Sequence, residues 1–171
     1  MAALMPANRL AMRVVLATGL RISDVLSLKT EWLNRQRFTV RELKTGKTRR
    51  VYIPAELRAE LLGQAGRLYV FEGRTDWRQH RTREAVYKDV KRAAAFFQRT
   101  GAVDKRLQVS PHSGRKVYAV EDYRRKGSLA AVGADLNHDP RHVAVTMLYA
   151  LSDKLGEREL TELAGKRKRG S

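Results

Sequence analysis

The chain has 171 residues, 43% of them apolar, and no cysteine, which predicts one globular domain without disulfides, zinc–thiolate sites or a thiol nucleophile. Lysine and arginine number 35 against 18 acidic residues, and the net charge of +17 favours nucleic acid as the partner, with an acidic membrane surface as the competing interpretation. No apolar run is long enough to span a bilayer and no signal peptide is recognisable, so we expect an intracellular protein.

The first part of the chain predicts short helices and one β-hairpin. A helix over residues 6–18 is followed by the interruption TGLR and by a second, short helix in ISDVLSL. The inward residues expected in the first helix are Leu10, Val14 and Ala17. Residues 38–53 alternate in polarity around the turn KTGK, which is typical of an antiparallel hairpin, and Pro54 is expected to open a third helix.

The remainder of the chain is predicted to be helical. The segment RLYVF reads either as a short strand or as a buried connection, and a polar loop follows at 74–80. A long helix is expected over 82–99, with Ala85, Val90, Ala93 and Phe97 facing inward. Further helices are expected at 111–126, 128–136 and 140–150, and in GERELTELAG. The predicted fold class is therefore mainly α with a small antiparallel β-sheet (α+β).

One stretch, SPHSGRKVYAV, places cations in the first turns of the helix predicted at 111–126. A helix N-terminus already carries partial positive charge, so this arrangement is unfavourable unless an anion lies opposite. His112 and Arg115 are three residues apart and share one helix face, which predicts a phosphate-binding site. Lys116 faces elsewhere and is expected to contact a DNA backbone.

Five segments follow one another in a fixed order: ATGLRISDVLSL, LKTGKTRRVYIP, PHSGRKVYA, LNH and TMLYA. Together they resemble the catalytic domain of the tyrosine recombinases, the phage integrase family. The resemblance runs from about residue 6 to residue 153 and implies a tyrosine-recombinase catalytic-domain-like fold. It implies an active site made of Arg21, Lys44, His112, Arg115, His138 and the nucleophile Tyr149. It also implies double-stranded DNA as the partner, a homo-tetramer assembled on DNA through the C-terminal segment, and a nucleoid-associated protein in a bacterial or phage context.

Domain organisation follows from the same resemblance. Residues 1–165 are expected to form a single catalytic domain, without the helical core-binding domain that usually precedes it in the family. Residues 166–171, KRKRGS, are expected to be a basic, disordered tail.

The chemistry of these residue types suits DNA strand cleavage and rejoining. A tyrosine hydroxyl can store the phosphodiester bond energy as a 3′-phosphotyrosine, so neither ATP nor another cofactor is expected. Arginine forks can meet the charge on the non-bridging oxygens, and a lysine on a hairpin can protonate the departing 5′-oxygen. Lys44 is the expected general acid, and Lys47 in the same turn is the alternative. If Lys44 is the acid, Lys47 is expected to contact the DNA backbone. Asp24 either orients an active-site cation or caps its own helix.

Two alternative functions are also compatible with these residues. A type IB topoisomerase resembles the recombinases in active-site chemistry but does not exchange strands between duplexes. A DNA-binding regulator could keep the fold without cleaving DNA.

Two alternatives also concern individual residues. His142 could partly replace His138, because the interval from His138 to Tyr149 is slightly longer than is usual in the family and Asn137 stands where the family generally has glycine. The spacing of acidic and histidine residues between 135 and 142 also suggests an alternative, a metal site formed by Asp135, His138, Asp139 and His142. Pro140 disfavours one continuous helix face there, so no metal is expected.

Overall fold

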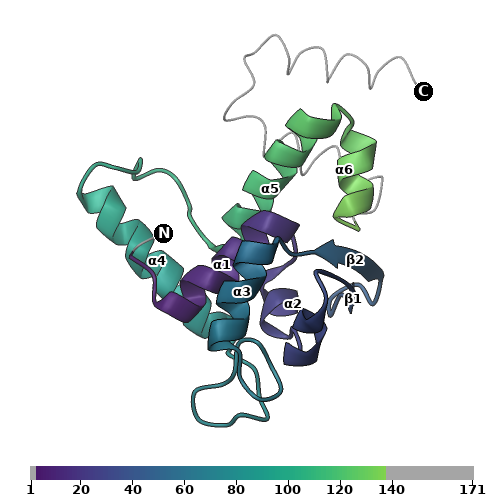
Figure 1. The fold of residues 1–171 in the computed structure, drawn as a ribbon. Coiled ribbons are helices and arrows are strands. Elements are labelled where there is room, and N and C mark those ends of the chain that lie inside the picture. Colours follow the sequence, from purple (N-terminus) through teal and green to yellow (C-terminus); the bar gives the residue numbers. More distant parts are fainter. Residues whose placement is uncertain (1–2, 138–171) are drawn as a thin grey trace. The chain divides into compact units, whose positions relative to one another are not determined.

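The computed structural model describes residues 3–137 (Figure 1). The described residues divide after Tyr118 into two units, and each is described by itself. The elements in chain order are α1 (Pro6–Thr18), α2 (Ile22–Leu26), the 3-10 turn η1 (Thr30–Asn34), β1 (Arg37–Arg41), β2 (Thr48–Tyr52), α3 (Ala55–Gln64), α4 (Arg83–Arg99), α5 (Pro111–Lys126) and α6 (Leu129–Asp135). This order confirms the predicted class of mainly α with a small antiparallel sheet. Within residues 3–137, no helix combines the length and the apolar character that crossing a bilayer requires.

Helix α1 runs through the core of the first unit, packed against α2 and α3. It ends at Gly19, which adopts the left-handed conformation (φ 65°) and donates its N–H to the carbonyl of Val15, a common helix stop. Leu10 and Val14 are buried as predicted, but Ala17 is exposed and that part of the prediction is wrong. Thr18 takes the inward position instead, because its hydroxyl is satisfied by the Val14 carbonyl at 2.7 Å.

The hairpin forms the only sheet in the described part of the chain. Its antiparallel register pairs Arg37 with Tyr52 and Arg41 with Thr48. Val40 and Val51 point into the core, while the residues on either side of them in each strand are exposed. The segment RLYVF is a connection that is buried only at Val70 and Phe71, while Leu68 is exposed, and an isolated bridge joins residues 29 and 69.

Helix α4 is rotated by about one residue from the predicted orientation. Val90 is buried as expected, whereas Ala85, Ala93 and Phe97 are only half-buried. The buried stripe is instead Val86, Val90 and Ala94, together with Asp89. Asp89 accepts hydrogen bonds from the backbone of Met5 at 2.9 Å and from the side chain of Asn8 at 2.7 Å, and this buried polar contact with the start of α1 sets the rotation.

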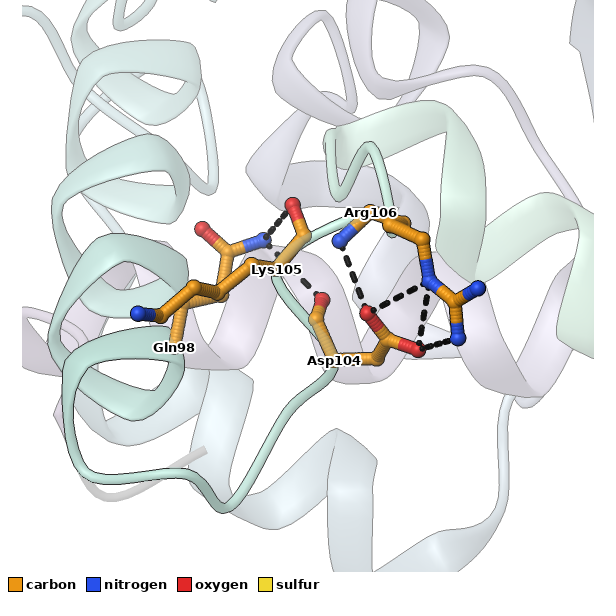
Figure 2. Close-up of polar contacts among 4 residues, drawn as sticks. All are labelled: Gln98, Asp104, Lys105 and Arg106. Atoms are coloured by element: carbon orange, nitrogen blue, oxygen red, sulfur yellow. Dashed lines mark hydrogen bonds and ion pairs between the residues drawn. The ribbon is translucent and has the colours of Figure 1, made fainter.

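The loop between α4 and α5 is tied down by side-chain hydrogen bonds (Figure 2). Gln98 donates from its amide nitrogen to the carbonyls of Asp104 at 3.3 Å and Leu107 at 2.9 Å. The Asp104 carboxylate accepts from the backbone and from the guanidinium of Arg106, at 2.9 and 2.8 Å. These contacts order the chain just before α5 begins.

The second unit is described as far as Asn137. Helix α5 ends at Gly127 (φ 65°), as predicted, with the Gly127 N–H donated to Tyr123 at 2.7 Å. Ser128 caps α6 by accepting from the backbone of Ala131 at 3.3 Å. The helices predicted at 140–150 and in GERELTELAG lie outside the described residues.

Candidate active site

A pocket of about 760 Å³ opens in the first unit where the α1–α2 turn, the hairpin turn, α4 and the start of α5 come together. Four of the predicted site residues line it: Arg21, Lys44, His112 and Arg115. The rest of its wall is formed by Leu20, Ile22, Ser23, Leu43, Arg83, Glu84, Tyr87, Lys88, Ser110 and Pro111. Three motifs that are far apart in the sequence therefore meet at one cavity, and all four predicted residues there can carry positive charge.

Arg21 is held by a buried carboxylate that no sequence pattern indicated. Its Nη1 donates to Oε2 of Glu42 at 2.5 Å, and the Glu42 side chain has no exposed surface. The hydroxyl of Thr45 donates to the same oxygen at 2.8 Å. Burial alone would raise the pKa of Glu42, but the hydrogen bonds from Thr45 and Arg21 and the nearby positive charges outweigh it and lower that pKa. Glu42 is therefore an anion at neutral pH.

Asp24 is the second buried acid beside the pocket. Its Oδ1 accepts the backbone N–H of Leu43 at 2.9 Å, so its hydrogen bond goes to the hairpin turn rather than to helix α2 or to a cation. Burial raises the pKa of Asp24, the Leu43 hydrogen bond opposes this, and the negative charge of Glu42 adds to the rise. The backbone on one side of Lys44 is thus fixed by Asp24.

Arg115 reaches the pocket from inside the protein, with 3% of its surface exposed. Its Nη1 donates to the carbonyl of Gly19, while Arg49 donates to the neighbouring carbonyl of Thr18. Both guanidinium groups therefore lie at the C-terminal end of α1, where the helix dipole favours cations. Burial, reinforced by the positive charges of Arg21 and Arg49, lowers the pKa of Arg115 to about 10, so it remains charged at neutral pH.

His112 is the second residue of α5, and the first turn of that helix contains no acid. Partial desolvation of its ring lowers the pKa of His112, and the charges of Arg115, Lys116, Arg21 and Lys44 lower it further. The imidazole is therefore mostly neutral at pH 7 and keeps one N–H to donate. These positive charges repel one another, and an anion bound in the pocket would relieve that repulsion.

The remaining predicted residues lie outside the pocket or outside the described part of the chain. Lys47 and Lys116 are exposed and do not line the pocket, so their predicted contacts with DNA stay predictions. Three of the predicted catalytic positions lie outside the described residues: His138, its alternative His142, and Tyr149. Among residues 3–137, no three acidic or histidine side chains lie close enough to hold a metal ion.

Helix α4, which was predicted only as a core helix, also forms one wall of the pocket. Arg83, Glu84, Tyr87 and Lys88 all line the pocket, and Tyr87 is 45% exposed. Their spacing of one helical turn could have identified this polar face, because residues four apart lie side by side on a helix. The pocket therefore has a tyrosine within residues 3–137 that is distinct from the predicted nucleophile.

A comparison with protein families decides the assignment. The phage integrase family matches residues 2–155. The chain belongs to this family. No curated protein matches the chain at a significant level.

Solved structures share the integrase fold at low sequence identity. The XerH site-specific recombinase, in a post-cleavage complex with a palindromic difH substrate, is 20% identical, with a TM-score of 0.67 over 93% of this chain and 45% of that chain. The XerA recombinase is 23% identical, with a TM-score of 0.58 over 94% of this chain and 58% of its own. The catalytic domain of the bacteriophage HP1 integrase is 24% identical, with a TM-score of 0.54 over 82% of this chain and 72% of its own. The integrase chain described here thus spans about half the length of XerH and XerA.

Proposed function

We propose that this member of the phage integrase family is the catalytic domain of a site-specific DNA recombinase or integrase, which cleaves and rejoins DNA through a 3′-phosphotyrosine on Tyr149. The observation that carries the proposal is the convergence of Arg21, Lys44, His112 and Arg115 on one pocket. In-line displacement at a DNA phosphate is favoured by groups that stabilise its charge and protonate the leaving oxygen. The pocket supplies two guanidinium groups, a neutral imidazole and a lysine on the hairpin turn.

The proposed reaction balances without a metal or ATP. The Tyr149 oxygen attacks phosphorus, its phenol proton passes to solvent water, and the bond from phosphorus to the 5′-oxygen breaks. Arg21 and Arg115 stabilise the charge that develops on the non-bridging oxygens, with further hydrogen bonds from His112 and His138. Lys44 gives its proton to the departing 5′-oxygen, and the reverse sequence rejoins the strand.

Double-stranded DNA is the proposed partner. The net charge of +17 and the cationic pocket support binding through phosphates, with an affinity that falls steeply as salt rises. The Tn1549 transposon integrase was solved in complex with transposon right end DNA, which supports the same kind of partner for this chain. We also propose that the chain assembles as a homo-tetramer on DNA through its C-terminal segment.

A pool of nicked DNA duplexes with randomised centres tests this function. The nick lets a short fragment diffuse away after cleavage, so a covalent protein–DNA adduct accumulates and survives denaturation. We expect the chain to form such an adduct. DNA binding without an adduct would instead favour the non-catalytic regulator.

The recovered sequences then distinguish the two enzymatic functions. A recombinase exchanges strands between two duplexes that carry its site, whereas a type IB topoisomerase relaxes supercoiled DNA without exchange. Strand exchange between recovered sites is the expected result, and relaxation alone would contradict it.

A further inference from the structure

Glu42 links two parts of the pocket that come from different segments of the chain. It directly follows β1, and its Oε2 accepts from Arg21 on the α1–α2 turn and from Thr45 in the hairpin turn. Its backbone closes the same turn: the Glu42 N–H donates to Lys47 at 2.9 Å and the Glu42 carbonyl accepts from Gly46 at 2.8 Å. Glu42 therefore holds the turn that carries Lys44 through both its backbone and its side chain. The same side chain also holds Arg21.

Stability alone is a weak reason for a carboxylate at this position. Taking a charged pair out of water is expensive, and well-packed apolar side chains of similar volume often stabilise a protein as well or better. The second oxygen of Glu42, Oε1, is buried without a hydrogen-bond partner among the described residues, which adds to the penalty. The desolvation free energy of this carboxylate is offset functionally if the pocket needs a fixed anion behind its cations.

We infer that Glu42 is a positioning residue that couples Arg21 to the turn carrying Lys44, so that the cation stabilising the phosphate and the proton donor are set by one buried carboxylate. This inference rests on the proposed function. Glu42 uses only one of the N–H groups of Arg21, and the guanidinium still lines the pocket, where its other donors can meet a phosphate. Asp24 fixes the backbone of Leu43 but makes no hydrogen bond to Arg21, so within residues 3–137 Glu42 is the carboxylate that contacts both the arginine and the turn.

The test uses two substrates that separate the two partners of Glu42. In ordinary DNA the departing 5′-oxygen needs a proton, whereas a bridging 5′-sulfur leaves as a thiolate and needs none, since thiols have a pKa of about 8.5. A defect that acts only through Lys44 is fully rescued by sulfur. A defect that acts only through Arg21 is not rescued. A residue that couples both gives partial rescue.

For Glu42→Gln, which keeps the shape and removes the charge, we expect single-turnover cleavage of ordinary DNA to slow by roughly 10- to 10²-fold, the scale of a small misplacement of reacting groups. The sulfur substrate should recover part of that loss, with DNA affinity nearly unchanged. Full rescue, no rescue, or a wild-type rate on ordinary DNA would each overturn the coupling.

Thr45→Val tests the same contact if Glu42→Gln folds poorly. Thr45 is exposed, and its substitution removes no buried charge. Loss of its hydrogen bond to Glu42 should slow ordinary DNA cleavage by roughly 3- to 10-fold, the scale of one hydrogen bond, and sulfur should rescue it fully. A Thr45→Val rate equal to wild type would contradict the role of Glu42 in holding the turn.

Glu60→Gln is the matched control. Glu60 also pairs with an arginine, Arg13, but on the surface and away from the pocket, so its loss should leave both rates unchanged. If the wild-type chain forms no adduct with either substrate, the proposed function fails and the inference falls with it. If the wild type cleaves and Glu42→Gln cleaves equally well, the inference alone fails.

Discussion

Arg115 donates a hydrogen bond to the main-chain carbonyl of Gly19, across 96 positions of the sequence. This contact joins the end of α1 to the first turns of α5. Arg21 lies two residues beyond Gly19 and lines the same pocket, so the conformation of Gly19 sets the placement of both arginines.

Substitution of Gly19 by alanine should therefore damage both stability and activity. Gly19 has a positive φ, and an added Cβ would lie 2.3 Å from the Tyr118 ring on α5. Gly101→Ala is the matched control, because Gly101 also has a positive φ but faces open space. Gly101→Ala should lower the free energy of unfolding by about 1–2 kcal/mol, and Gly19→Ala by more. Equal losses in denaturant titrations would show that contact with Tyr118 is unimportant.

The pH dependence of His112 provides a second prediction. Desolvation and neighbouring cations lower the pKa of His112 in the folded chain below the ordinary value of 6.5. As the pH falls below 6.5 the unfolded chain takes up this proton first, so the His112 contribution to stability is present above pH 6.5 and is lost on acidification through the folded pKa. Histidine NMR titration should find a pKa below 6.5 in the free chain and a higher one when DNA is bound. A pKa at or above 6.5 in the free chain would contradict the cationic surroundings.

Arginine geometry, beyond charge, should matter at the pocket. Arg21→Lys and Arg115→Lys keep a positive charge but lose the planar fork, so we expect cleavage to fall by at least roughly 10²-fold, the scale of one lost oxyanion donor. Arg13→Lys, at an exposed ion pair away from the pocket, is the control. Thermal unfolding of each variant separates misfolding from loss of function. A folded Arg115→Lys chain with near-wild-type cleavage would refute its role at the phosphate.

The identity of the general acid can be tested by comparing two lysines of the same turn. Lys44 lines the pocket and Lys47 does not. Lys44→Ala should cleave ordinary DNA very slowly and 5′-sulfur DNA at close to the wild-type rate, whereas Lys47→Ala should cleave both substrates well. Rescue of Lys47→Ala alone would assign the proton to Lys47. Rescue of neither variant would shift it to another group, with His138 next.

Sequence patterns predicted the local elements well where apolar spacing and turn residues agree. The hairpin around KTGK and the stop at Gly127 are examples, because each depends on residues close together in the chain. The meeting of Arg21, Lys44 and Arg115 depends on long-range packing, and only the family resemblance indicated it before the structure.

The parts that the sequence did not predict involve polar groups in the interior. Glu42 and Asp89 are acids, which are ordinarily exposed, and nothing local indicates that distant partners will satisfy them. Thr18 takes the place of Ala17 in the core through a local contact instead, since its hydroxyl is satisfied by the Val14 carbonyl one helical turn earlier. The burial of Glu42 and Asp89 is decided by tertiary hydrogen bonds, and apolar periodicity indicates neither kind of contact.

The most direct test of the account is to identify the residue that becomes attached to DNA. The covalent adduct formed on a nicked duplex is digested, and the DNA-bearing peptide is sequenced by mass spectrometry for the wild type, Tyr149→Phe and Tyr87→Phe. Tyr87 is the informative control, because it lines the described pocket. We predict attachment at Tyr149, no adduct from Tyr149→Phe with DNA affinity nearly retained, and a normal adduct from Tyr87→Phe. Attachment at Tyr87 or at any other residue, or an adduct that persists in Tyr149→Phe, would contradict the account.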